Sequence, residues 1–455
     1  MKLWLANKWD SLSGSFWFVP TLMVIAAIGL SLMTIHLDRA TTNENWLATL
    51  GWTFSRGPEG SRALLATVAG SMMTIASVTF SITIVALQLA SSQFGPRLLR
   101  NFMRDRGNQV AIGTFIATFT YCLLILRTVN GTDSEQFVPH ISVTVALGLA
   151  FFSVGVLIYF IHHSAESIQA ENVIAAVSRD LHSAIDRLYP QRLGHEASDD
   201  SKHLSERDLP TDFNNDHCKI NSARSDYLQA INVDQLLEIA RDRDLVLSIV
   251  RRPGKFCFKG DAIALAGPSA KVDDSIMESI RSEFFFGHRR TLLQDVEFAI
   301  DQLVEVAVRA LSPGVNDPFT AINCVDRLGA ALCDLADKVI PSPKRYDEDG
   351  KLRVVTDAST VQGIVDASFD QIRQAARKDT SVTVRLLETI AAVARQTEAP
   401  AFRSALHRQA DAIHRGSQEG LADGADREDA KRCFREAMAA LNGAGEVSSH
   451  ASQHS

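Results

Sequence analysis

Four long apolar segments in the first third of the chain constrain its fold more than any other feature. Arg127 is the one Asp, Glu, Lys or Arg that they contain, and it lies near the end of its segment, where its side chain can reach the membrane interface. A helix needs roughly 20 apolar residues to cross the hydrocarbon layer of a bilayer. Each segment is long enough, so we predict four membrane-spanning helices, at Phe16–Leu37, Ala63–Ala90, Val110–Val129 and Val138–Ile161.

Positive charge in a short loop predicts the orientation of these helices. The connection after the second segment, the basic loop, contains Arg97, Arg100, Arg104 and Arg106, with Asp105 as its one acid. Short loops rich in arginine stay in the cytoplasm. We therefore expect this loop and both chain termini to be cytoplasmic. A purely orienting role is the simpler interpretation of the arginines, and a site for anionic lipid or another anion is the alternative.

Net charge and composition separate the chain into unlike parts. From Met1 to Ala165 there are ten Lys or Arg and seven Asp or Glu, a charge of +3, and the whole-chain value of -7 leaves -10 for the rest. An acidic soluble part does not suit nucleic acid as a partner. We predict a four-helix transmembrane domain at 1–165, a helical extension and polar linker at 166–225, and a cytoplasmic α-rich domain with a small β element at 226–455.

Hydroxyl and amide groups recur along the second apolar segment at steps of three and four residues. This spacing places them on one face of a helix. Such a polar stripe avoids lipid, so it faces either another helix, where small residues and hydroxyls pack closely, or water in a pore formed by several copies. The amide of Gln88, which is costly in hydrocarbon, keeps the pore in consideration. The polar stripe consists of Gly70, Thr74, Ser77, Ser81 and Gln88.

The polar part of the chain is predicted to be mainly helical. Because Pro190 is the first helix breaker after the fourth apolar segment, that helix is expected to continue to Tyr189, about 50 residues in all. The Asp-, Ser- and Asn-rich residues 191–225 resemble a mobile linker. Strands separated by Gly-containing turns are predicted at Leu245–Val250, Lys255–Phe258 and Ala262–Ala266. Helices are predicted at Asp273–Phe286, Gln294–Leu311, Pro318–Ile340, Ala358–Arg377, Ser381–Arg395, Ala399–Arg415 and Arg427–Leu441.

The segment from Arg309 to Ala321 has the most distinctive composition of the polar part. In the structural interpretation, which we favour, Asp317 caps a helix that begins at Pro318, where the missing N–H has no cost. In the functional interpretation, a small polar ligand binds at this helix N-terminus. The candidate ligand loop then comprises Arg309, Asn316, Asp317 and Thr320, together with charged residues of the preceding segment, namely His288, Arg289, Arg290, Asp295 and Glu297.

Four specific strings resemble a family of bacterial membrane proteins known as domain of unknown function 2254. They are Ser81–Arg97, Arg252–Phe256 (RPGKF), Gln294–Phe298 (QDVEF) and Arg309–Ala321. The resemblance covers nearly the whole chain. It implies a multi-pass protein of the bacterial cytoplasmic (inner) membrane, and it says little about activity.

Two functions are consistent with these patterns. The first is a homo-oligomeric channel or transport protein that its cytoplasmic domain gates, with a small ion as the permeating species. The second is a membrane-anchored sensor of a polar ligand, or a scaffold, without a conduction path. We do not expect an enzyme, because GxxxxGK[ST], GxGxxG, HExxH and GxSxG do not occur. No Cys or His spacing implies a metal, and no pattern implies a cofactor.

Overall fold

The computed structural model describes residues 15–40, 57–95, 105–132, 135–167, 169–189, 213 and 215–443. The chain divides into two compact units, a membrane unit up to Val173 and a C-terminal unit that begins at Ile174. Each unit has its own apolar cores. We describe each unit by itself.

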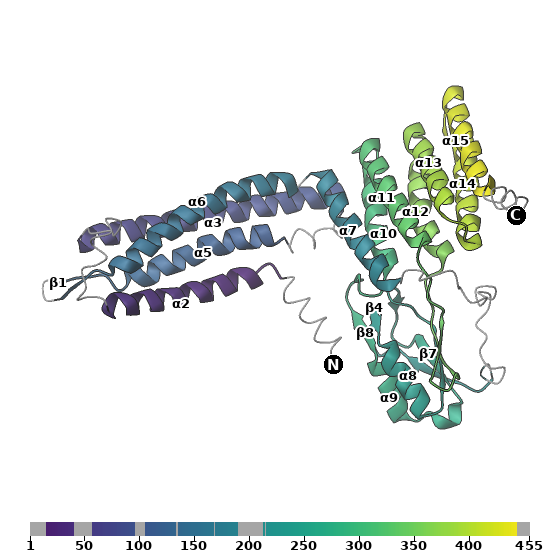
Figure 1. Cartoon of the computed structure of the whole chain (residues 1–455), viewed down its shortest axis with the longest axis horizontal. Coiled ribbons are helices and arrows are strands. Elements are labelled where there is room, and N and C mark those ends of the chain that lie inside the picture. Colours follow the sequence, from purple (N-terminus) through teal and green to yellow (C-terminus); the bar gives the residue numbers. More distant parts are fainter. Residues whose placement is uncertain are drawn as a thin grey trace, which may run out of the picture. The chain divides into compact units, whose positions relative to one another are not determined.

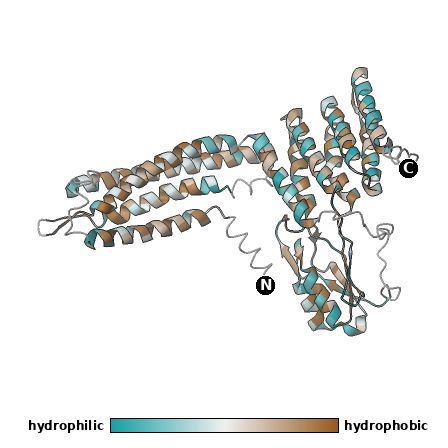
Figure 2. Cartoon of the chain, in the orientation of Figure 1, coloured by the Kyte–Doolittle hydropathy of each residue, from teal (hydrophilic) through white to brown (hydrophobic). Residues whose placement is uncertain are grey.

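The membrane unit is a bundle of four helices, as the sequence predicts. They are α2 (Phe18–Ala40), α3 (Pro58–Phe94), α5 (Arg106–Leu126) and α6 (His140–Ser167), all long and apolar enough to cross a bilayer (Figures 1 and 2). In α5, 56% of the most apolar stretch is buried, against 22% to 28% in the other three helices. Helix α5 is therefore the central helix, and its packing against α2, α3 and α6 holds the bundle together.

A buried carboxylate fastens one end of the bundle. Asp38, close to the end of α2, accepts hydrogen bonds from the backbone N–H groups of Ile141 and Ser142, at 2.8 and 2.9 Å, and from the Ser142 hydroxyl. These N–H groups belong to the first turn of α6 and have no acceptor within their own helix. Tyr121 of α5 extends the network, because its hydroxyl contacts Thr34 Oγ1 and the Ser142 carbonyl.

The fourth membrane helix does not continue to Tyr189, so the prediction of one long helix is wrong. The structure contains two helices, α6 and α7 (Ala170–Leu188). The Gln169 N–H bonds to the Glu166 carbonyl, three residues back, and the Asn172 side chain donates to the same carbonyl at 2.8 Å. These local bonds replace the regular hydrogen bonds of an α-helix. Because no proline or glycine occurs at this place, the sequence did not predict the break.

The β part of the C-terminal unit is larger than predicted. The three predicted strands are confirmed as β5 (Val246–Ile249), β6 (Phe256–Cys257) and β7 (Ala262–Gly267). They join a five-stranded sheet of order β3-β7-β5-β10-β9 and a three-stranded sheet of order β6-β4-β8. The sequence did not predict α8 (Val233–Asp242) or the remaining strands, which are β3 (Cys218–Asn221), β4 (Asp226–Ile231), β8 (Phe284–Gly287), β9 (Lys344–Tyr346) and β10 (Leu352–Val355).

Two of these strands overturn specific predictions. Strand β3 lies within the expected linker, and it pairs with β7 in antiparallel register, Cys218 opposite Ala266. Within that linker, residues 191–212 and 214 lie outside the described residues. Strand β8 replaces the end of the helix predicted at Asp273–Phe286, and the helix itself, α9 (Asp274–Ser282), ends earlier. Both sheets share one apolar core with α8 and α9, built around Leu228, Leu247 and Ile280.

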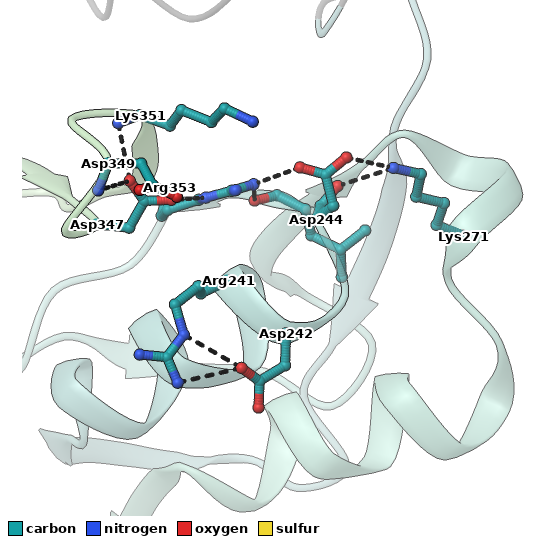
Figure 3. A network of polar contacts seen from close by, with 9 residues as sticks. Arg241, Asp242, Asp244, Lys271, Asp347, Asp349, Lys351 and Arg353 are labelled. Atoms are coloured by element: carbon teal, nitrogen blue, oxygen red, sulfur yellow. Dashed lines mark hydrogen bonds and ion pairs between the residues drawn. The ribbon is translucent and has the colours of Figure 1, made fainter.

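A charged network attaches the β9–β10 hairpin to the rest of the five-stranded sheet (Figure 3). The Arg353 side chain donates to Asp347 at 2.7 Å and to Asp244 at 2.8 Å, and Asp244 also contacts Lys271. The hydrogen bond from Arg353 lowers the pKa of the Asp347 carboxyl. Asp347 also accepts from the Lys351 backbone N–H, so the same carboxylate orders the turn.

The remaining helices pack side by side and extend the C-terminal unit (Figure 1). Helix α7 contributes Leu181 and Ile185 to their apolar interior, where they meet Leu328 of α11. All six helices were predicted to within a few residues, and they are α10 (Val296–Ala310), α11 (Pro318–Ala336), α12 (Val361–Ala375), α13 (Thr380–Gln396), α14 (Pro400–Gly420) and α15 (Gly424–Asn442).

Candidate functional site

The polar stripe lies on a face of α3 that the other described helices leave exposed. The residues that α3 buries recur on a different face, at Leu65, Ala69, Met72, Ala76, Thr79, Thr83, Ala86 and Ala90. With about 100° of rotation per residue, the five-residue offset from Leu65 to Gly70 places the stripe about 140° around the helix from this packed face. All five stripe residues are exposed, and a side chain at Gly70 would have no neighbour within 4 Å. The stripe is therefore not a packing seam between described helices of the same chain.

The hydroxyls of the stripe are satisfied by their own helix. Thr74 donates to the Gly70 carbonyl at 3.0 Å, Ser77 to the Met73 carbonyl at 2.9 Å, and Ser81 to the Ser77 carbonyl at 2.9 Å. Gln88 differs from them, because its exposed amide makes no hydrogen bond within the described part of the chain. Gln88 is thus the residue of the stripe that most needs a polar partner or water.

The basic loop is mostly outside the described residues, since Arg97, Arg100 and Arg104 fall in the gap between α3 and α5. Arg106 is described, and it is the exposed first residue of α5. The arginine site therefore stays a prediction.

A histidine–aspartate pair next to the basic loop was missed at the sequence level. Asp105 caps α5 by accepting from the Gly107 N–H at 2.8 Å, and its other oxygen lies 2.7 Å from Nε2 of His163 in α6. The ring of Tyr159 stacks on His163, and Gly107 allows this approach, since a Cβ there would lie 2.6 Å from Nε2. The pair joins residues 58 positions apart, and no local spacing pattern indicates such a contact.

The candidate ligand loop has the capping geometry that the sequence predicts. Asp317 is the N-cap of α11, because its carboxylate accepts from the Thr320 backbone N–H at 3.1 Å and from the Thr320 hydroxyl at 2.6 Å. Asn316 adopts a positive φ of 51°, which Asn tolerates better than most residues, and its N–H bonds to the Ser312 carbonyl. The loop exposes Phe319, a residue that is 83% accessible.

The wider charged cluster expected around this loop does not form. Arg309 stands at the end of α10, 3.8 Å from Glu305, whereas Asp295 and Glu297 stand at the start of that helix. A helix of 15 residues is about 22 Å long, so the two ends cannot share one small ligand. The prediction ignored the length of the intervening helix.

Asp295 and Glu297 belong instead to a charged junction between the two strings RPGKF and QDVEF. The Arg252 guanidinium donates to the Glu297 carboxylate at 2.9 Å and approaches its second oxygen at 2.8 Å, and Lys255 lies 3.8 Å away. Gly254 has φ +91°, and a Cβ there would lie 2.1 Å from Asp295 Oδ2. Glycine is thus needed at 254 for its conformation and for its closeness to Asp295.

Each polar residue of QDVEF has a defined partner in this junction. The Gln294 amide exchanges two hydrogen bonds with the backbone of Ile231 in β4. Asp295 caps α10 through the Phe298 N–H and binds Arg290, which also contacts Asp301. Figure 1 shows that β4 and α10 belong to the two parts of the C-terminal unit, the sheets and the helices. The two strings therefore join those parts.

A tyrosine at the end of α7 completes the junction. Burial and the nearby Glu297 raise the pKa of Tyr189 to about 12, although Arg252 acts in the opposite direction. Arg252 also reaches Ser359, next to the N-cap Thr360 of α12. Four segments distant in sequence thus meet at one set of largely buried charges. The charged residues present are paired with one another, which is the arrangement of an architectural ion-pair cluster.

A bundle of four apolar, membrane-length helices followed by a mainly α unit with small sheets defines a multi-pass helical membrane protein. The sequence matches the family described as predicted membrane protein (DUF2254) over residues 13–392, and this chain belongs to that family. The match includes the polar stripe and the charged junction, whereas α14 and α15 follow it.

Relatives occur in mycobacteria. The chain is 33% identical over 426 residues to the uncharacterized protein Mb1321c of Mycobacterium bovis and, to the same extent, to the uncharacterized protein Rv1290c of Mycobacterium tuberculosis. These alignments cover 92% of this chain and 79% of each relative. No solved structure is significantly similar to this chain.

We expect Asp317→Ala to destabilise the protein by about 1 kcal/mol, because α11 loses its N-cap hydrogen bonds. Thermal unfolding of the purified protein in detergent measures this change. Thr320→Val, which removes the hydroxyl contact but keeps the backbone cap, is the matched control and should have a smaller effect. An unchanged unfolding midpoint together with lost function would contradict the capping role and favour a ligand site.

The contact between the two strings is tested by comparing two glycines. Gly254 and Gly260 both have positive φ, at +91° and +95°, but only Gly254 faces a neighbour, Asp295. Gly254→Ala should destabilise the protein by more than about 1 kcal/mol. Gly260→Ala should destabilise it by less, because an alanine there causes backbone strain but meets no neighbouring atom. Equal unfolding midpoints for the two variants would show that the approach of Asp295 to Gly254 is unimportant.

Proposed function

We propose that this protein forms a homo-oligomeric membrane channel in which the polar stripes of several copies surround a shared path for a small ion. The observation that carries this proposal is the exposed position of the stripe, and of Gln88 above all, on the membrane helix α3. A surface that faces another subunit or lines a pore must be exposed in a single copy of the chain.

Gln88 is the stripe residue with the highest energetic cost in lipid. Back-bonded hydroxyls such as those of Ser77 and Ser81 are tolerated by lipid, because their donors already have acceptors. An amide without a partner costs about 2 kcal/mol or more in an apolar medium. Copies related by rotational symmetry place equivalent glutamines around one axis, where they can bond to water or to each other. The same helix has exposed Val78, Ile82 and Val85 for contact with lipid.

Gating by the C-terminal unit is part of the proposal. Helix α6 ends at Ser167 and α7 begins at Ala170, so the membrane bundle continues into the C-terminal unit after a very short connection. The His163–Asp105 pair ties α6, near this connection, to the start of α5. A movement of α7 would therefore reach the bundle through α6 and this pair.

We further propose that the protein lies in the bacterial inner membrane with both termini in the cytoplasm. The support is the positive charge of the basic loop and the even number of spans. A reporter that is active only in the cytoplasm, fused after Ser455, should be active, and the same reporter inserted at residue 45, in the connection between α2 and α3, should be inactive. The opposite pattern would contradict the orientation.

The channel proposal predicts a specific response to Ser81→Leu combined with Gln88→Leu. The double variant should fold and assemble in normal amounts, because leucine is well tolerated on an exposed membrane face, but flux through reconstituted liposomes should be lost as the path becomes apolar. The matched control is Thr79→Leu with Thr83→Leu on the buried face of α3, which should lower the folded yield by overpacking.

Other outcomes of these experiments would refute the proposal. If Ser81→Leu with Gln88→Leu abolished assembly, the stripe would be a packing surface between copies and not a water path. If the wild-type protein in liposomes passed no ion under any gradient, the alternative of a membrane-anchored ligand sensor or scaffold would be favoured.

A further inference from the structure

An exposed aromatic cluster lies on the three-stranded sheet of the C-terminal unit. Phe256 and Phe258 are 41% and 63% accessible, which is high for phenylalanine. The rings of Tyr227 and Phe256 are 5.1 Å apart, as are those of Phe256 and Phe258, all in edge-to-face geometry. The three rings therefore form one surface, and part of it belongs to the string RPGKF.

Basic side chains border these rings because two turns adjoin. The Lys259 N–H bonds to Ser225 Oγ, and the Gly260 N–H bonds to the Ser222 carbonyl. These bonds place the β3–β4 turn, with Arg224, beside the β6–β7 turn, with Lys259. We call Arg224, Tyr227, Phe256, Phe258 and Lys259 the aromatic–basic patch.

The local charge of this patch is positive. Arg224 and Lys259 have no ion-pair partner among the described residues, and both are exposed. Two acids lie beside the patch, and both have basic partners, Asp226 with His288 and Asp261 with Arg251. Asp261 also accepts a hydrogen bond from the Phe258 backbone N–H at 3.2 Å. The patch contrasts with the charge of -10 that residues 166–455 carry. A surface of aromatic rings between Lys and Arg is the combination that binds the interface of an anionic bilayer.

We propose that the aromatic–basic patch docks onto the anionic phospholipid headgroups of the membrane in which the protein is anchored. Arg224 and Lys259 would contact the phosphates, and Phe258 would enter the interfacial layer. The membrane helices support this choice of partner, because they tether the unit to a bilayer and thus keep the local concentration of lipid high. The acidic remainder of the unit is repelled by anionic lipid, so docking at the patch would also select one orientation.

The patch is also mechanically connected to the charged junction. Lys255 lies 3.8 Å from Glu297, and the Lys255 carbonyl accepts from the Leu228 N–H. Arg252, in the same string, binds Glu297. Contact with lipid at Phe256 and Phe258 would therefore be transmitted to the start of α10 through RPGKF.

A fluorophore at the patch tests the proposal in the full-length protein. Cys218 and Cys333, which are only half-buried, are first replaced by serine, and Phe258→Cys is then labelled with the environment-sensitive dye NBD. The protein is placed in nanodiscs of phosphatidylcholine alone or mixed with phosphatidylglycerol. We expect a blue shift of the NBD emission, and quenching by nitroxide-labelled lipid, only in the anionic discs and to a smaller degree at high salt.

Control variants separate lipid docking from other causes. Arg224→Ser with Lys259→Ser should abolish the shift, whereas removal of two exposed charges from α15, Lys431→Ser with Arg435→Ser, should leave it intact. A label at Tyr346→Cys, an exposed position on β9, should report water in both kinds of disc. An NBD spectrum at 258 that is identical in both lipids would overturn the proposal. So would a shift that persists in detergent, which would indicate a second copy or another protein segment as the occupant.

Discussion

The high cost of an unpaired polar group in hydrocarbon accounts for most features of the membrane unit. Asp38 is buried but accepts three hydrogen bonds from the first turn of α6, and Tyr121 is buried with partners on α2 and α6. The hydroxyls of Thr74, Ser77 and Ser81 in α3 bond to their own backbone. Gln88 is exposed on a membrane-spanning helix and makes no hydrogen bond within the described chain, which directs attention to the polar stripe as a surface for other copies and water.

The C-terminal unit depends on a different kind of interaction, a buried set of charges that joins its sheets to its helices. Two of the strings by which the chain resembles its family, RPGKF and QDVEF, meet there through Arg252, Glu297 and the close contact of Gly254 with Asp295. These motifs thus mark an internal junction between the sheets and the helices of the unit. The same RPGKF segment ends with Phe256, one of the exposed aromatic rings, so this string contributes both to the internal junction and to the protein surface.

Local signals in the sequence predicted the four membrane helices, the Asp317 cap and the later helices, because each depends on residues close together in the chain. Strand β10 was missed because it pairs in parallel with β5, Val354 beside Leu247, more than a hundred residues away. The apolar run at Phe284 fits a helix end or a strand equally well, and only pairing with β4 decides between them. The His163–Asp105 pair and the Arg252–Glu297 pair are likewise tertiary contacts. The stripe was predicted as a helix face, but its exposure depends on where the other helices pack.

The central claim is that the polar stripe of α3 faces other copies of the chain, and cysteine cross-linking in native membranes tests it most directly. Single cysteines would be introduced at Thr74, Ser81 or Gln88 in the stripe and, for comparison, at Val78 and Val85 on the neighbouring exposed face, with the buried Cys122 left in place. Our account predicts oxidative dimers for the stripe positions and few for the valine positions. Equal cross-linking on both faces, or none in the stripe, would contradict it.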